Sequence, residues 1–163
     1  RFKESDVRSV GRTAIGVRGI RLANNDRVVS LIVAESSDPI LTATEKGYGK
    51  RTLLDEYRAQ ARGGSGVISI KTSDRNGQVV GAIQVTDEDE MMLISDKGTL
   101  VRARAADVSV IGRNTQGVTL INIAEDEKLV SVAKIAETDD EDSNDENTND
   151  LNNHDVASSE PEE

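Results

Sequence analysis

The sequence of 163 residues contains no cysteine and a single histidine, His154. It therefore has no disulfide framework, and it lacks the Cys and His ligand sets of zinc fingers. Aromatic residues are scarce, with two Tyr, one Phe and no Trp. A core must be built from Val, Ile, Leu and Ala, a composition that favours β-strands over a large aromatic-lined pocket.

Long hydrophobic runs are also missing, since no apolar stretch approaches the roughly 18 residues of a membrane-spanning helix. Basic residues are absent from one end of the chain. Residues 1–136 contain 20 Lys and Arg and 18 Asp and Glu, a balance of +2, whereas residues 137–163 contain 12 acids and no base. This pattern predicts a near-neutral body of residues 1–136 and a disordered acidic tail of residues 137–163.

A motif recurs three times, as VGRTAIGV at 10–17, QARGGSGV at 60–67 and IGRNTQGV at 111–118. Its arginine and its last glycine return after 50 and then 51 residues, at Arg12, Arg62 and Arg113 and at Gly16, Gly66 and Gly117. An internal period of this length indicates a repeat architecture of about 50 residues per unit.

Hydrophobic alternation and turn residues predict four short strands in each complete repeat. We expect them at 40–45, 51–57, 66–71 and 78–86 in the second repeat, and at 91–95, 99–108, 118–123 and 128–135 in the third. Four short strands per unit are typical of a propeller-like blade. Because Arg1 aligns with Arg51, the first repeat begins within its second strand. We therefore expect an all-β chain of about three blades over residues 1–136, the first truncated, forming an incomplete disc.

Catalytic patterns are absent from the sequence. There is no Gly-x4-Gly-Lys-Ser/Thr phosphate loop, and the acidic runs at 87–90 and 139–150 lack the glycine of a calcium loop. His154 lies in the acidic tail, and neither Tyr48 nor Tyr57 has a paired base. We predict no catalytic residue and no metal site in this chain.

The body carries 13 Arg and 7 Lys. The planar guanidinium of arginine donates two hydrogen bonds to a phosphate and stays charged at any relevant pH. Because one arginine recurs at the same loop position in every repeat, a disc of such blades would have a cationic perimeter suited to the backbone of a bent polyanion. The alternative is that these arginines are solvated charges, paired in part with acids of the same period.

Three segments, GYGKR at 47–51, KGTLVR at 97–102 and VIGRNTQGV at 110–118, precede an acidic end. Together they resemble the last blades of the C-terminal domain of the DNA gyrase A subunit, and the resemblance covers residues 1–136. It implies a β-pinwheel, a disc of about six propeller-like blades. The basic perimeter of such a disc wraps double-stranded DNA and supports ATP-dependent negative supercoiling.

With the repeat, this resemblance predicts nine DNA-binding residues: Arg12, Arg18, Arg21, Lys46, Lys50, Arg51, Arg62, Lys97 and Arg113. It implies no cofactor here, because ATP and Mg²⁺ would be bound elsewhere in the holoenzyme. The implied partners are duplex DNA, the gyrase B subunit, which completes an A2B2 assembly, and the rest of the gyrase A subunit. The implied location is the bacterial cytoplasm, in association with the nucleoid.

Two departures from the family pattern limit the inference. The diagnostic box of the family, Gln-Arg-Arg-Gly-Gly-Lys-Gly, is matched only in part by QARGGSG at 60–66, which lacks two of its basic residues. The cleavage tyrosine of the family lies in the N-terminal half of the protein, so neither Tyr48 nor Tyr57 takes that role. Two alternatives remain: the equivalent domain of topoisomerase IV, and a propeller that binds proteins.

Overall fold

The computed structural model describes residues 1–136, so the predicted tail at 137–163 lies outside the described residues. Within them the chain forms seven strands: β1 (Ile40–Thr44), β2 (Tyr48–Thr52), β3 (Val79–Gln84), β4 (Glu90–Ser95), β5 (Leu100–Arg104), β6 (Val118–Thr119) and β7 (Leu129–Lys134). The only helices in this part are single 3-10 turns, η1 (Glu4–Asp6), η2 (Leu54–Glu56) and η3 (Ala105–Asp107). None of them could cross a membrane. The predicted all-β class is confirmed.

The strands form two antiparallel sheets, in the orders β3-β1-β2-β6 and β5-β4-β7. Each contains a hairpin from one repeat, and the two hairpin turns use glycines at equivalent positions, Gly47 (φ 76°) and Gly98 (φ 88°). The register also shifts at equivalent places, between Ala43 and Thr44 and between Ile94 and Ser95. The second and third repeats therefore build the same three-stranded unit.

The fourth strand of the first sheet comes from the following repeat. Strand β6 pairs with β2 through Tyr48 and Thr119 and through Gly49 and Val118. Just upstream, the Ile111 amide donates to the Arg51 carbonyl at 2.9 Å. Strand exchange between neighbouring repeats thus completes this blade.

Part of the strand prediction was wrong. Residues 66–71 are described and form no strand, because the partner of this segment would lie in the first repeat, whose residues 1–39 contain none. A strand needs a neighbour to satisfy its amides and carbonyls. The second strands differ as well: β2 begins three residues before the predicted 51–57 and ends ahead of η2, and β5 ends ahead of η3, short of the predicted 99–108.

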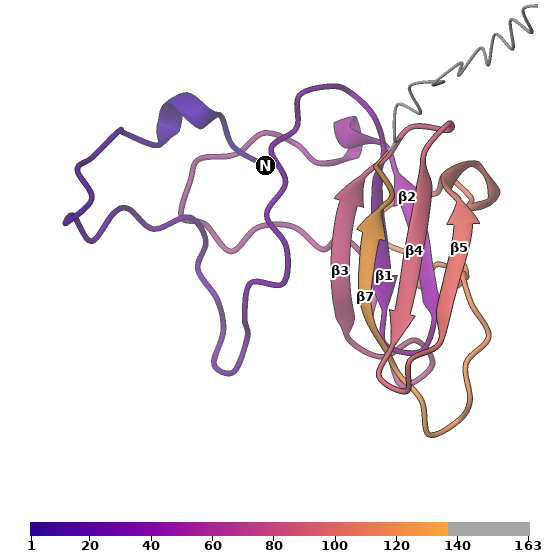
Figure 1. The fold of residues 1–163 in the computed structure, drawn as a ribbon. Coiled ribbons are helices and arrows are strands. Elements are labelled where there is room, and N and C mark those ends of the chain that lie inside the picture. The colour runs from indigo at the N-terminus through magenta and orange to yellow at the C-terminus, as the bar shows by residue number, and fades with distance from the viewer. Residues whose placement is uncertain (137–163) are drawn as a thin grey trace, which may run out of the picture.

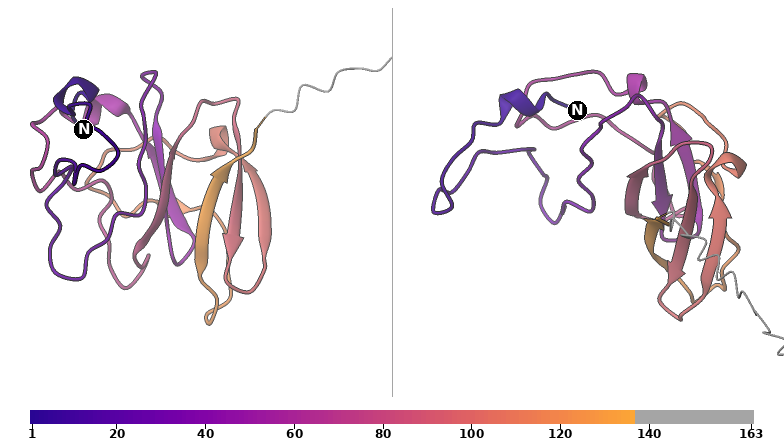
Figure 2. Two further views of the ribbon diagram at one scale, coloured as in Figure 1. Left: turned by 60° about the vertical axis from the view of Figure 1, so that its left-hand side comes forward. Right: turned by 45° about the horizontal axis from the view of Figure 1, so that its top comes forward.

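The two sheets pack through β3 and β7, where a Cβ at Gly81 would lie 3.0 Å from Val132 Cγ1. Their core is aliphatic, as expected: Leu41, Ala43, Val85, Met91, Leu93, Ala105, Val108, Ile121, Leu129 and Val132. Figure 1 shows the strands gathered on one side of the molecule and most of the N-terminal loops, in indigo, on the other. Both views in Figure 2 keep these loops away from β4, β5 and β7.

Candidate nucleic-acid interface

The repeated motif forms three loops, which we name the first loop (residues 10–21), the second loop (60–71) and the third loop (111–122). Each contains a glycine with positive φ at the same repeat position: Gly16 (85°), Gly66 (78°) and Gly117 (82°). Glycine adopts this region without the steric cost that a Cβ imposes. The repeat in sequence is therefore also a repeat in backbone conformation.

The second loop lies on the first. The Gly63 amide donates to the Gly19 carbonyl at 2.9 Å, and the Arg21 amide donates to the Gly64 carbonyl at 2.8 Å. The guanidinium of Arg62 adds hydrogen bonds to the carbonyls of Arg18 and Asp6. In Figure 1 these two segments run together on the side away from the sheets.

The third loop lies on the second in the same way. The Lys71 amide donates to the Thr115 carbonyl at 2.9 Å, and Arg113 Nη1 donates to the Ile68 carbonyl at 2.8 Å. Arg18 and Ile68 hold equivalent positions in their repeats, 50 residues apart. The repeated arginine therefore makes the same bond from one loop to the preceding one, so the loops overlap in series.

The nine predicted DNA-binding residues fall into three groups by exposure. Arg12, Arg18, Arg21, Lys46 and Lys97 are exposed, Arg62 and Arg113 are half-buried, and Lys50 and Arg51 are buried. DNA contact by any of them stays a prediction. A direct phosphate contact requires an accessible cation, and the two buried residues have none to offer.

The exposed cations also differ in whether they form ion pairs with acidic side chains. On the third repeat, ion pairs join Lys97 to Asp126, Arg102 to Glu90, Arg104 to Asp107 and Lys134 to Asp89. Within residues 1–136 the arginines of the three loops, at 12, 18, 21, 62 and 113, form no ion pair. The loops of the described chain therefore carry a group of arginines whose charge no acidic side chain compensates.

Lys50 is fully buried in β2, and its ammonium points into the third loop. Nζ donates to the carbonyls of Gly112 at 2.7 Å and Arg113 at 2.5 Å, and to Thr115 Oγ1 at 3.1 Å and the Thr115 carbonyl at 3.5 Å. Burial lowers the pKa of Lys50 to about 8; Arg113 acts in the same direction and Glu56 opposes it. Lys50 thus binds the loop that carries Arg113.

Arg51, the next residue, is also buried and bonds to other parts of the protein. Its Nε donates to the Val108 carbonyl at 2.8 Å, and its Nη1 pairs with Asp87. These bonds tie β2 to the residue after η3 and to the segment between β3 and β4. Sequence reasoning missed the burial of both cations because charge alone favoured an exposed site.

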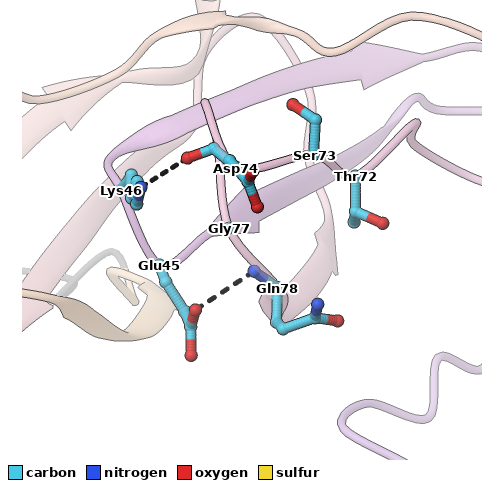
Figure 3. A pocket seen from close by; sticks show the side chains of 7 residues that line it. All are labelled: Glu45, Lys46, Thr72, Ser73, Asp74, Gly77 and Gln78. Atoms are coloured by element: carbon cyan, nitrogen blue, oxygen red, sulfur yellow. Dashed lines mark hydrogen bonds between the residues drawn. The ribbon is translucent and has the colours of Figure 1, made fainter.

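Lys46 lies at the edge of a shallow hollow of about 340 Å³ shown in Figure 3. Its ammonium donates to the Asp74 carbonyl, and Glu45 Oε2 accepts from the Gln78 amide at 3.2 Å. The lining is polar and includes two carboxylates: Glu45, Lys46, Thr72, Ser73, Asp74, Gly77 and Gln78. These acids disfavour an anionic ligand here.

Sequence reasoning also missed Arg75, which is exposed and stacks on the ring of Tyr48 with 4.9 Å between Cζ and the ring centroid. A guanidinium held by a cation–π contact keeps its hydrogen-bond donors available. In the sequence, the exposure of Arg75 is indicated only by the turn sequence Asp-Arg-Asn-Gly at 74–77, because a turn exposes its second residue. Among residues 1–136, no cluster of three acidic or histidine side chains could hold a metal ion.

The family model described as DNA gyrase C-terminal domain, beta-propeller, matches residues 1–35, 38–86 and 89–136. The chain belongs to this family. The family resemblance inferred from residues 47–51, 97–102 and 110–118 is confirmed.

Similar proteins of the gyrase family cover most of this chain. The DNA gyrase A subunit of Klebsiella oxytoca is 60% identical over 143 residues, which are 87% of this chain and 16% of that protein. The corresponding protein of Pseudomonas aeruginosa is 49% identical over an alignment of 165 residues, which covers 99% of this chain and 18% of that protein. The chain thus spans less than a fifth of the length of these relatives.

Solved structures show the same fold. The structure of a DNA gyrase A C-terminal domain matches with a TM-score of 0.77 and 32% identity, covering 83% of this chain and 46% of that one. The C-terminal domain of a DNA topoisomerase IV matches with a TM-score of 0.75 and 27% identity, covering 82% of this chain and 42% of that one. Because the two gyrase relatives are 49% and 60% identical, gyrase is the family assignment and topoisomerase IV is the alternative.

Proposed function

We propose that this chain is the DNA-binding and DNA-wrapping part of a DNA gyrase A subunit, where it supports ATP-dependent negative supercoiling of double-stranded DNA. The observation that carries the proposal is the series of overlapping loops, each with an arginine at the same position and none of these arginines in an ion pair within the described chain.

The spacing of the loops suits a long anionic ligand. Ile68, the residue that accepts from Arg113, lies six positions after Arg62, so the Cα atoms of Arg62 and Ile68 are at most about 20 Å apart. Duplex DNA carries a phosphate charge about every 1.7 Å of its axis, so a duplex lying across the loops would bring phosphates within reach of each of them. Contacts to the DNA backbone alone allow bending with little sequence preference.

The partners follow from this role. The chain would act with the B subunit, which joins it in an A2B2 holoenzyme, together with the rest of its own A subunit. That holoenzyme would supply ATP hydrolysis and Mg²⁺ binding, and it would work in the bacterial cytoplasm, at the nucleoid. The chain would hold the DNA and leave strand cleavage to other parts of the holoenzyme.

The test is DNA affinity as a function of salt. For the full chain, the logarithm of the association constant with a duplex of random sequence should fall linearly with the logarithm of salt concentration, with a slope of about −0.9 per phosphate contacted. An affinity that does not change between low and physiological salt would overturn the proposal.

A charge-matched pair of variants locates the interface. Replacing Arg12, Arg18 and Arg21 with Gln removes three exposed charges from the first loop. We expect about a ten-fold or larger loss of affinity at low salt and a slope smaller by about 2 to 3. The control replaces Arg104, Lys128 and Lys134 with Gln, away from the loops. Equal losses would assign the effect to net charge alone.

Exposed apolar side chains favour a second candidate, a protein-binding propeller. Leu31 and Val33 are 86% and 73% exposed, and Val28 is 62% exposed. Apolar residues gathered on one segment are typical of a protein contact. Absence of salt-dependent DNA binding, together with concentration-dependent association that Leu31→Asp abolishes, would favour this function instead.

A further inference from the structure

Three backbone carbonyls of the third loop converge on one point inside the protein, and the ammonium of Lys50 occupies it. The carbonyls belong to Gly112, Arg113 and Thr115, and the Thr115 hydroxyl completes the set. Carbonyl dipoles that point at a common centre repel one another unless a donor or a cation lies between them. The loop therefore keeps this shape only while the centre is filled.

We propose that Lys50 is a positioning residue, whose ammonium fixes the third loop in the conformation that presents Arg113 to DNA. The effect of Lys50 on DNA binding rests on the proposed function, whereas its effect on the conformation of the third loop does not. The role requires no contact between Lys50 and DNA, since the side chain of Lys50 is fully buried.

The position of Arg113 depends on its backbone more than on its own contacts. Nη1 donates to the Ile68 carbonyl, whereas Nε is buried and has no hydrogen-bond partner within the described residues. The carbonyl of Arg113 is at the same time an acceptor of Lys50. The ammonium of Lys50, one repeat away, thus anchors the backbone from which this guanidinium extends.

This anchor is specific to one interface. The third repeat has Val101 at the position of Lys50, and an apolar side chain offers no donor to carbonyls. Charged groups around Lys50 do not replace it: Arg113 repels it, and Glu56, at the end of η2, attracts it. The phenol of Tyr57 bonds to Ser69 Oγ at 2.8 Å, and Ser69 Oγ lies 3.4 Å from Thr42 Oγ1, the β1 residue paired with Lys50.

The first test follows the loop without DNA. In Lys50→Met the buried carbonyls lose their donor, so the loop should open to water while the sheets remain folded. We expect trypsin to cleave after Arg113 at least about ten times faster than in the intact chain, and the Thr115 and Leu120 amides to exchange faster. The control is Lys128→Met, which removes the same charge from an exposed site.

The second test is a double-mutant cycle on DNA affinity with Lys50→Met and Arg113→Gln. If Lys50 acts through Arg113, the double variant binds no more weakly than Arg113→Gln alone. Additive losses would overturn the positioning role and indicate an independent effect of charge. If the protection of the third loop depends on Lys50 but the chain binds no DNA, the proposed function is wrong and the role of Lys50 in fixing the loop stands.

The third test restores the missing group. Lys50→Ala keeps Cβ and leaves room for n-propylammonium, which has the atoms that the substitution removes. Added n-propylammonium should slow tryptic cleavage after Arg113 toward the rate of the intact chain, whereas n-propanol, with a single donor and no charge, should not. No difference between the two compounds, or unchanged loop protection in Lys50→Met, would overturn the proposal.

Discussion

At the scale of single residues, the glycines of the repeat are fixed by close approach as much as by conformation. A Cβ at Gly117 (φ 82°) would lie 2.4 Å from the Gly49 carbonyl oxygen, because Gly117 leads into β6, which pairs with β2 at Gly49. Gly98 has a positive φ and no neighbour within 4 Å, and Gly112 has neither restriction. Substitution of these three glycines therefore distinguishes the cost of a left-handed backbone from the cost of a steric clash with the added Cβ.

We expect Gly112→Ala to be neutral, Gly98→Ala to cost about 1 kcal/mol and Gly117→Ala to cost about 3 kcal/mol or more. The cost is largest for Gly117→Ala because only this substitution combines the strain of a left-handed backbone conformation with a steric clash against the backbone. Urea unfolding of the three variants measures the free energies. A Gly117→Ala cost no larger than that of Gly98→Ala would contradict the close approach of β6 to β2.

The buried ammonium of Lys50 gives a pH dependence of definite sign. Its pKa is lowered from 10.5 to about 8, chiefly by burial. Below pH 8 the amine is charged in both the folded and the unfolded chain. Between about pH 8 and 10.5 the folded chain has released a proton that the unfolded chain still binds. The free energy of unfolding therefore rises with pH in this window, by at most about 3 kcal/mol.

Lys50→Met should lack this rise, because it removes the titrating group. Urea unfolding at several values between pH 7 and pH 10.5 in both chains measures the difference, and Lys128→Met supplies the charge-matched control. The same pH dependence in Lys50→Met and in the intact chain would show that another group titrates.

At the scale of elements, strand exchange links the repeats. The amide of Leu120 donates to the Gly47 carbonyl at 2.8 Å, across the boundary between the third and the second repeat. Leu120→Pro removes this donor, so it should destabilise β1 and β2 in the preceding repeat by about 2 kcal/mol more than Leu120→Ala does. Amide exchange of Leu41 and Arg51 reports the effect. Loss of protection confined to the third repeat would contradict the coupling.

The sequence predicts local features better than pairings. The strands near 40–45, 91–95 and 128–135 could be predicted, because alternation and turn residues are local signals. The exchange of β6 could not, since Tyr48 and Thr119 are 71 positions apart and the paired strand has only two residues. For the same reason, residues 66–71 alternate like a strand but form none, because their partner is not set by their own composition.

The candidate site could be predicted in part as well. The repeat in the sequence pointed to the loops that carry Arg12, Arg62 and Arg113. In the structure the second loop contacts the first loop, and the third loop contacts the second. Repetition did not reveal that Arg62 and Arg113 also bond to the preceding loop. Nor did it reveal the burial of Lys50, which depends on a loop 62 residues away along the chain.

At the scale of the whole molecule, charge is segregated. Four cations of the third repeat, Lys97, Arg102, Arg104 and Lys134, are paired with acids, whereas the arginines of the loops form no ion pair within the described chain. Along the sequence, residues 1–136 sum to +2 and residues 137–163 to −12. An anionic ligand therefore meets attraction at the loops and repulsion from the C-terminal acids.

We expect the C-terminal acids to compete with DNA for the loops. Tethering gives these 12 carboxylates a high effective concentration near the body, so individually weak contacts suffice. Deleting residues 137–163 changes the net charge from −10 to +2 and should raise DNA affinity, most at low salt, where screening is weakest. A second variant keeps the length and replaces the acids with Asn and Gln, which separates charge from the bulk of the segment. If both variants bind DNA more tightly by the same factor, charge is the cause; if neither differs from the intact chain at low salt, the acids do not compete for the loops.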